Sequence, residues 1–407
     1  MALLVTQPSE GLPPLAATTR SIYEAAYQLS QGTGPFAIDT ERAGAYRYDD
    51  RAYLLQIRRE GSGTVLIDPE ANRRLVTSVL GKVINNQPWI IHAAATDLPC
   101  LSELGFYPST IFDTELAGRL AGLPRVNLAS MLEERLEVTL KKAHGAEDWS
   151  RRPLPHSWLV YAALDVEKLI PLAESMKLLL EAHGKLEWHK QECAHLINTS
   201  SHGLDTQRSW QDIKGVSRLT RPRQLVVAEA LWELRDDEAR MKNTSVSRLL
   251  PDKVLISVAQ RPPRNSQAAL RASEIPKQYR KRIARWMPTI NDVLESDPRT
   301  WPHTPQFDEN QLPSKYVWEK IHPESLDDFE EVKNSIVEKA LLLNLPAENL
   351  MQPHSVKELC WQLRDVPRPI AQDDVIECLM RLEARPWQID NSASVITDTL
   401  NKIEHAS

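Results

Sequence analysis

The stretch F-A-I-D-T-E at residues 36–41 has the pattern of a short apolar strand that ends in two acids. Side chains alternate along a strand, so Asp39 and Glu41 share one face. Two carboxylates forced onto one face repel each other, and a bound divalent cation removes that cost. A solvated strand end is the alternative interpretation, and the pair alone does not decide between the two.

The segments around this strand alternate between strand and helix patterns. Apolar runs bounded by turn residues predict further strands at 52–58, 64–68, 88–93 and 110–113. Helical spacing is found at 18–30, 72–84, 94–104, 114–136 and from Pro155 to about His183. Interleaved strands and helices predict an α/β domain, which we place at residues 1–205.

A third acid follows the apolar run at 88–93. That strand would deliver its end to the same sheet edge as Asp39, and Asp97 would then lie in the first turns of the next helix. The electrostatics of a helix start favour an acid at this position in any case. We interpret His92, at the end of the run, as a core histidine with satisfied hydrogen bonds.

A fourth acid is paired with a tyrosine. Tyr161 and Asp165 are four residues apart, so they lie one turn apart on the same helix face. Such a carboxylate can ligate a metal while the phenol hydroxyl holds a water. An ordinary tyrosine–aspartate pair is the alternative.

Together, D-x-E, an aspartate after a strand and Y-x-x-x-D resemble the tyrosine-bearing branch of the DEDD exonuclease superfamily. The segments FDTELAGRLAG (112–122), DWSRRPLP (148–155) and YAALDVEKL (161–169) are similar to the ribonuclease D family. Residues 210–243 and 249–260 resemble an HRDC domain, and an exonuclease followed by an HRDC domain is the arrangement of that family.

The resemblance implies a ribonuclease H-like exonuclease domain, with a mixed sheet flanked by helices, followed by all-α modules. It implies that four acids ligate metal and that Tyr161 orients the attacking water; the acids are Asp39, Glu41, Asp97 and Asp165. Two divalent cations are expected, and hard oxygen ligands favour Mg²⁺ or Mn²⁺.

The same resemblance implies hydrolysis of RNA from the 3′ end to nucleoside 5′-monophosphates, with tRNA precursors or other structured RNA as the substrate. One alternative is a 3′-5′ exonuclease that acts on DNA. Another is a catalytically silent nucleic-acid-binding relative. No residue by itself indicates recognition of a 2′-hydroxyl.

The remainder of the chain has helical patterns. We assign residues 206–295 to the HRDC domain, 296–323 to a proline-rich connector and 324–407 to a second HRDC-like domain. In both helical modules a proline precedes a valine by three residues, at Pro251 and Pro353, which suggests a diverged repeat.

The net charge of −6 hides a segregated distribution. Residues 206–290 carry 18 basic and 8 acidic residues, a net charge of +10, against −16 for the rest of the chain. A basic module attracts phosphate, so we predict RNA contact by its densest cluster: Lys277, Arg280, Lys281, Arg282 and Arg285. Residues 319–400 have a net charge of −8. We expect this module to close a ring or brace the first one rather than grip RNA.

Four scattered cysteines without a C-x-x-C pair fit a reducing cytoplasm. The sequence contains no run of about 18 apolar residues, so it predicts no membrane-spanning helix. The N-terminus does not resemble a secretory signal. We therefore expect a cytoplasmic monomer without a membrane partner.

Overall fold

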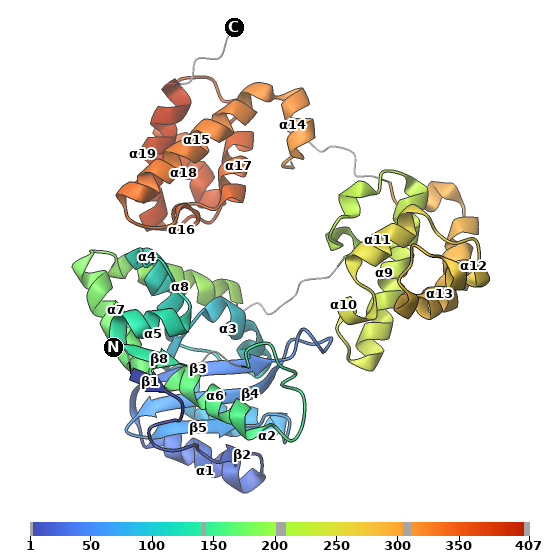
Figure 1. Cartoon of the computed structure of the whole chain (residues 1–407). Coiled ribbons are helices and arrows are strands. Elements are labelled where there is room, and N and C mark those ends of the chain that lie inside the picture. Colours follow the sequence, from blue (N-terminus) through green and yellow to red (C-terminus); the bar gives the residue numbers. More distant parts are fainter. Residues whose placement is uncertain (1–2, 141–143, 201–208, 304–310, 403–407) are drawn as a thin grey trace.

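The computed structural model describes residues 3–140, 144–200, 209–303 and 311–402. An α/β domain is followed by two helical modules (Figure 1). The predicted boundary between residues 205 and 206 lies outside the described residues. None of the helices within these ranges is long and apolar enough to cross a membrane.

The main sheet has six strands in the order β2-β5-β4-β3-β6-β7. Its members are β2 (Leu15–Ala16), β3 (Thr33–Arg42), β4 (Ala52–Glu60), β5 (Gly63–Ile67), β6 (Pro88–Ile91) and β7 (Thr110–Asp113). Strands β3, β4 and β5 pair antiparallel, whereas β3, β6 and β7 pair parallel. The expected mixed sheet is confirmed, and the ends of β3 and β6 point to the same edge. A small parallel pair, β1 (Leu3–Val5) with β8 (Val138–Leu140), was not predicted.

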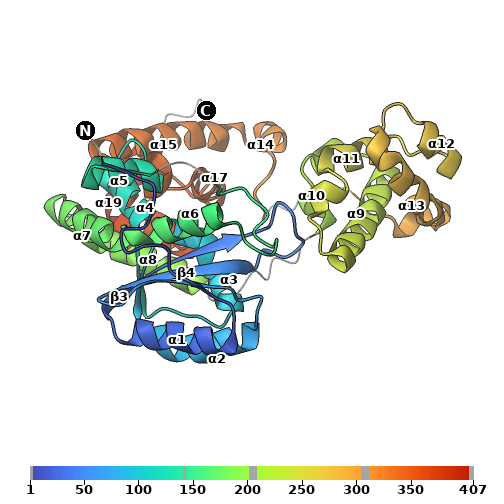
Figure 2. The same cartoon turned by 60° about the horizontal axis from the view of Figure 1, so that its bottom comes forward.

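Helices cover both faces of this sheet. Figure 2 shows α1 (Thr19–Ser30) and α2 (Arg73–Ile84) on one face and α6 (His156–Glu167) on the other. The remaining helices are α3 (Ala94–Glu103), α4 (Thr114–Ala121), α5 (Leu128–Leu136), α7 (Leu169–Ala182) and α8 (Leu186–Ser200).

Two predicted helices are each divided in the structure. The helix expected from Pro155 to His183 is interrupted at Lys168, between α6 and α7. Pro171 fits the break, because a proline ring clashes with the carbonyl four residues earlier and is best accommodated in the first turn of a helix. The pattern at 114–136 is divided by Gly122, which ends α4 with a φ of 78°.

The first helical module contains α9 (Pro222–Lys242), α10 (Val246–Leu249), α11 (Asp252–Gln260), α12 (Ser266–Arg271) and α13 (Lys277–Glu295). It has its own apolar core. The second module contains α15 (Pro323–Leu342), α16 (Ala347–Leu350), α17 (Pro353–Gln362), α18 (Gln372–Arg381) and α19 (Pro386–Lys402). In each, a long helix is followed by a four-residue helix, two helices of medium length and a second long helix, which supports the predicted repeat.

The second module begins earlier than its predicted start at residue 324. Helix α14 (Lys315–Ile321) lies within the proline-rich segment assigned to the connector. Its Trp318 is buried in the core of the module and donates a hydrogen bond to Ser325 at 2.6 Å. The proline-rich composition of this segment therefore led us to miss helix α14, which belongs to the second module.

Candidate active site

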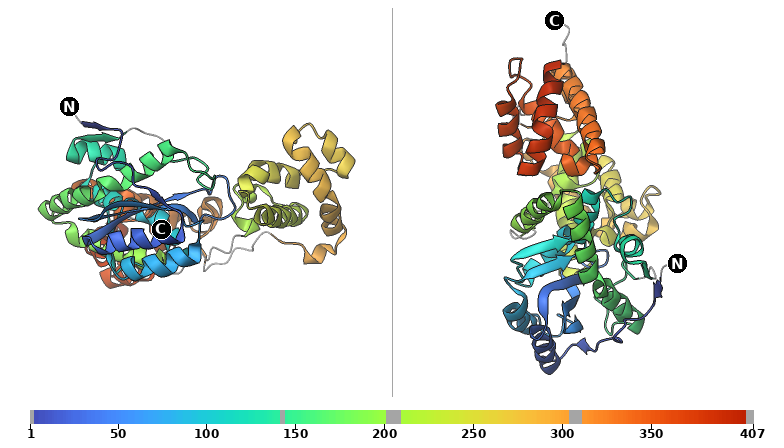
Figure 3. Two further views of the ribbon diagram at one scale, coloured as in Figure 1. Left: turned by 90° about the horizontal axis from the view of Figure 1, so that it is seen from below. Right: turned by 90° about the vertical axis from the view of Figure 1, so that its left-hand side faces the viewer.

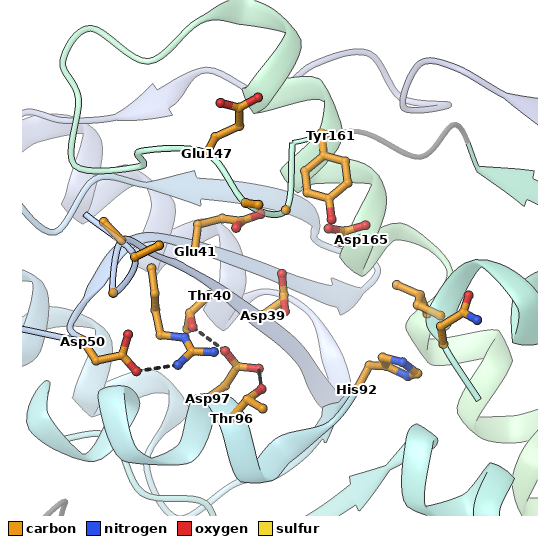
Figure 4. A pocket seen from close by; sticks show the side chains of 18 of the residues that line it. Asp39, Thr40, Glu41, Asp50, His92, Thr96, Asp97, Glu147, Tyr161 and Asp165 are labelled. Carbon is orange, nitrogen blue, oxygen red and sulfur yellow. Dashed lines mark hydrogen bonds and ion pairs between the residues drawn. The ribbon is translucent and has the colours of Figure 1, made fainter. Parts of the chain in front are cut away.

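Three carboxylates converge at the edge of the sheet where β3 ends. One oxygen from each of Asp39, Glu41 and Asp165 lies within 4.8 Å of the others. Asp39 and Glu41 share a face of β3, as strand alternation predicts, and α6 brings Asp165 opposite them (Figure 4). The sequence analysis grouped these three acids although about 125 residues separate Asp39 from Asp165. The structure brings them together as expected.

Asp97 lines the same pocket but has different neighbours. The pocket has a volume of about 880 Å³ and includes all four predicted acids and Tyr161. The Asp97 carboxylate accepts hydrogen bonds from the Thr40 hydroxyl at 2.5 Å and the Thr96 hydroxyl at 3.3 Å. Figure 4 shows Asp97 turned toward these two hydroxyls, and it is not part of the three-carboxylate cluster.

The four acids have raised pKa values. Burial, together with repulsion from neighbouring carboxylates, holds the pKa of Asp39 and of Glu41 well above the ordinary range. Burial raises the pKa of Asp97 to about 6 and that of Asp165 to about 7. The pocket therefore binds protons more readily than free carboxylates do, unless positive charge is supplied to it.

Tyr161 lies one turn before Asp165 on α6. Its hydroxyl points toward the Asp165 carboxylate (Figure 4), and burial together with the nearby negative charge raises the pKa of this phenol. The phenol stays protonated, so it can donate a hydrogen bond to one oxygen while accepting from a water.

Gln56 is a neighbour of the site that the sequence interpretation missed. It lies on β4 directly opposite Asp39, is fully buried, and donates from Nε2 to Asp39 Oδ2 at 2.7 Å. A buried polar residue in the otherwise apolar run 52–57 was the available signal, but its partner became visible only with the strand register.

The other polar residues near the site have structural partners. His92 Nδ1 lies 2.9 Å from the Thr114 hydroxyl, and burial lowers the pKa of His92 to about 4, which agrees with a satisfied core histidine. Asp113 caps α4 and also accepts from the backbone N–H groups of Ala93 and Ala94. Asp68, just after β5, holds Arg152 in a two-pronged ion pair. Asp113 is thus a capping residue, and Asp68 is a strand-end residue held by an ion pair.

The donor set fits a hard divalent cation. Three carboxylate oxygens within reach of one another are the ligands that Mg²⁺ and Mn²⁺ prefer, and raised pKa values indicate that these acids lack a counter-charge. Asp39, Glu41 and Asp165 would hold such an ion, with Asp97 adjacent.

The predicted RNA-binding cluster lies far from this pocket. Lys277, Arg280, Lys281, Arg282 and Arg285 all belong to α13. In Figures 1 and 2, α9 and α10 lie between α13 and the α/β domain. Two of the five basic side chains, Arg282 and Arg285, are paired with Glu238 of α9.

Comparisons with known proteins agree with this architecture. A family model described as a 3′-5′ exonuclease matches residues 15–181, an HRDC domain model matches 224–290, and a 3′ to 5′ exonuclease C-terminal domain model matches 311–400. Ribonuclease D from Bartonella henselae is 26% identical over 333 residues, which are 77% of this chain and 80% of that protein.

Two solved structures share the overall fold. The crystal structure of a protein from Bifidobacterium adolescentis is 30% identical, has a TM-score of 0.85, and is matched over 98% of this chain and 100% of that chain. Escherichia coli RNase D, an exoribonuclease involved in structured RNA processing, is 22% identical, has a TM-score of 0.68, and is matched over 91% of this chain and 99% of that chain. The order of the three family models and the similarity to ribonuclease D over most of the chain show that this protein belongs to the ribonuclease D family of 3′-5′ exonucleases.

Proposed function

We propose that this protein removes nucleotides from the 3′ end of tRNA precursors or other structured RNA, using two divalent cations, Mg²⁺ or Mn²⁺. Its class, a 3′-5′ exoribonuclease, follows from its family. The observation that supports the metal-dependent chemistry is the convergence of Asp39, Glu41 and Asp165.

The residues of the pocket would divide the work as follows. The acids Asp39, Glu41, Asp97 and Asp165 would hold the cations, which when bound neutralise charge on the phosphate and acidify the attacking water. Gln56 keeps the Asp39 carboxylate in place from the opposite strand. The protonated Tyr161 hydroxyl orients the water, so that it attacks the terminal phosphodiester and leaves a 5′-monophosphate.

RNA, rather than DNA, is the substrate that the family favours. The basic HRDC module would add affinity for the phosphate backbone, and the α13 cluster from Lys277 to Arg285 would contact double-stranded parts of the substrate away from the pocket. We place the enzyme in the cytoplasm, since its four cysteines are free thiols that are all buried. We expect it to act as a monomer.

The decisive experiment compares Asp39→Asn and Tyr161→Phe with the wild type on a 3′-extended tRNA and on matched single-stranded RNA and DNA. Asp39→Asn should abolish Mg²⁺-dependent release of 5′-monophosphates, and Tyr161→Phe should reduce it about 10²–10⁴-fold while metal binding is retained. EDTA should stop the wild type.

Asp68→Asn is the control, because Asp68 is a buried acid that binds Arg152 outside the pocket. Full activity in purified Asp39→Asn would show that the site assignment is wrong. Equal cleavage of RNA and DNA would favour the broader nuclease activity instead.

A further inference from the structure

The active pocket needs positive charge for its substrate as well as for its acids. Besides the four predicted acids it is lined by Asp50 and Glu147, and an RNA strand brings one negative charge per phosphate. Among the described residues that line it, Arg42 is the single arginine or lysine.

Arg42 is held at the wall of this pocket. It follows Glu41 at the end of β3, and its Nη1 donates to Asp50 Oδ2 at 2.6 Å. This is one of five guanidinium N–H groups, and the side chain remains 29% exposed. Asp50 thus orients the guanidinium group of Arg42, and the remaining N–H groups are available to a phosphate.

The loop between β3 and β4, residues 43–51, extends the wall toward the HRDC module. The backbone carbonyl of Tyr46 accepts from Ser245 N–H at 3.1 Å, and the Tyr48 N–H donates to the Asn243 side chain at 3.0 Å. The Tyr48 hydroxyl donates to Asp236 of α9 at 2.9 Å. The HRDC module therefore fixes the shape of a loop that lines the active pocket.

One basic residue of the HRDC module reaches the rim itself. Arg248 stacks on Tyr46, which lines the pocket, with its guanidinium carbon 3.9 Å from the ring centroid. Its Nε donates to the Ala45 carbonyl at 3.0 Å, and its side chain is exposed. Among the described residues Arg248 forms no ion pair, in contrast to Arg282 and Arg285 on α13.

A second cleft, which shares residues of this loop with the active pocket, is less suited to RNA. It has a volume of about 1040 Å³ and is lined by six acids and three arginines: Asp49, Asp50, Glu103, Asp212, Asp236, Asp252, Arg47, Arg235 and Arg240. Two of the arginines pair with acids of the same cleft, Arg235 with Asp252 and Arg240 with Asp236, each at 2.6 Å, which leaves the excess of acids unchanged. Six acids against three arginines give this cleft a formal charge of −3, which disfavours an RNA phosphate backbone relative to the path over Tyr46 and Arg248.

We propose that Arg42, Tyr46 and Arg248 form a composite RNA-contact strip, built from both domains, that guides the single-stranded 3′ segment into the active pocket. Arg42 binds a phosphate inside the pocket. The stacked Tyr46–Arg248 pair binds the preceding part of the strand at the rim. This inference rests on the proposed exoribonuclease function and assigns the HRDC module a contact at the active site, separate from the α13 cluster.

The test measures kcat and KM of Arg42→Gln, Arg248→Gln and the double variant on a single-stranded RNA oligomer over a series of salt concentrations. Each lost phosphate contact should raise KM about tenfold and reduce the slope of log kcat/KM against log salt by about 0.7. Arg42→Lys and Arg248→Lys keep the charge and should restore most of the slope.

Arg271→Gln is the matched control, because Arg271 is exposed at the end of α12, away from the pocket. Mg²⁺-induced thermal stabilisation of each variant checks that its metal site is intact. If the wild type fails to degrade RNA with either metal, the proposed function is wrong. If the wild type is active and Arg42→Gln and Arg248→Gln keep the slope of Arg271→Gln, the strip is wrong.

Discussion

The two helical modules have the same order of helices, yet they are attached to the exonuclease domain in opposite ways. The C-terminal module shares one continuous apolar core with it, extending from Leu120 and Leu172 to Trp361 and Leu400. The HRDC module keeps a separate core, and among the described residues it contacts the loop 43–51 of the exonuclease domain through hydrogen bonds and through the stacking of Arg248 on Tyr46. Figure 3 shows the C-terminal module stacked on the exonuclease domain and the HRDC module to one side.

Specific side chains join the C-terminal module to α8. Trp387 stacks on Trp188 with ring centroids 4.7 Å apart, and Arg385 pairs with Glu192 at 2.6 Å. The buried Lys185 donates to the carbonyls of Leu120, Leu343 and Asn344, and so links the ends of helices from both parts. The expected bracing role therefore falls on the exonuclease domain, because that is where these contacts are made.

The difference shows that the same order of helices can be attached to one domain in two ways. Buried apolar surface joins the C-terminal module permanently to the catalytic domain. The basic HRDC module has its own apolar core, and a few hydrogen bonds are enough for it to position a loop of the active pocket.

Deleting each module in turn tests this contrast most severely. A chain ending at residue 303 should lose cooperative unfolding of the exonuclease domain, because half of a shared core becomes exposed. Replacing residues 209–303 with a flexible linker should leave that transition in place. Soluble yield and calorimetry of the two shortened proteins measure these effects. A chain ending at residue 303 that melts like the full chain would contradict the shared core.

Trp387→Ala should destabilise the exonuclease transition by about 3–5 kcal/mol, because it removes a buried ring and leaves a cavity between the two parts. Chemical denaturation measures the loss. Tyr316→Ala is the control, since Tyr316 is 66% exposed and should cost less than about 0.5 kcal/mol. A similar small cost at Trp387 would mean that the stacked pair is not part of the joint.

Mg²⁺ should raise the melting temperature of the exonuclease and C-terminal transition but not that of the HRDC transition. At about 100 times its dissociation constant the ion adds about 2.7 kcal/mol. The raised pKa values of the pocket acids mean that the folded state holds more protons than the unfolded state between about pH 4 and 7. Metal-free stability therefore falls as the pH rises through that window.

Since the ion binds the deprotonated acids, its stabilisation should be larger at pH 8 than at pH 5. Scanning calorimetry at both pH values measures it, with Asp39→Asn as the control that should lose most of the shift. Equal shifts at both pH values would contradict the assignment.

Lys185→Met should destabilise the joint by about 1–3 kcal/mol, because carbonyls of both parts lose a buried donor. Lys177→Met, on the exposed surface of α7, is the comparison. Denaturation curves that coincide for the two variants would show that the three carbonyls find other partners.

Tyr48→Phe should have the smallest effect, about 1 kcal/mol or less on global stability, because Asp236 keeps its ion pair with Arg240. It should nevertheless increase amide exchange in the loop 43–51. Unchanged exchange would indicate that the other loop contacts suffice to hold the HRDC module.

The sequence alone determined what depends on local periodicity. Strand alternation placed Asp39 and Glu41 together, and helical spacing placed Tyr161 beside Asp165, since both follow from backbone geometry within a few residues. The break before Pro171 was equally local and was overlooked.

Tertiary structure decided what depends on packing between distant segments. It turned Asp97 toward Thr40, set Gln56 against Asp39, and brought Arg248 to the pocket rim while α13 lies away from it. The charge of a segment is readable from its residues. The neighbour that this charge faces is not, because helix docking is governed by apolar surfaces and hydrogen bonds contributed by other parts of the chain.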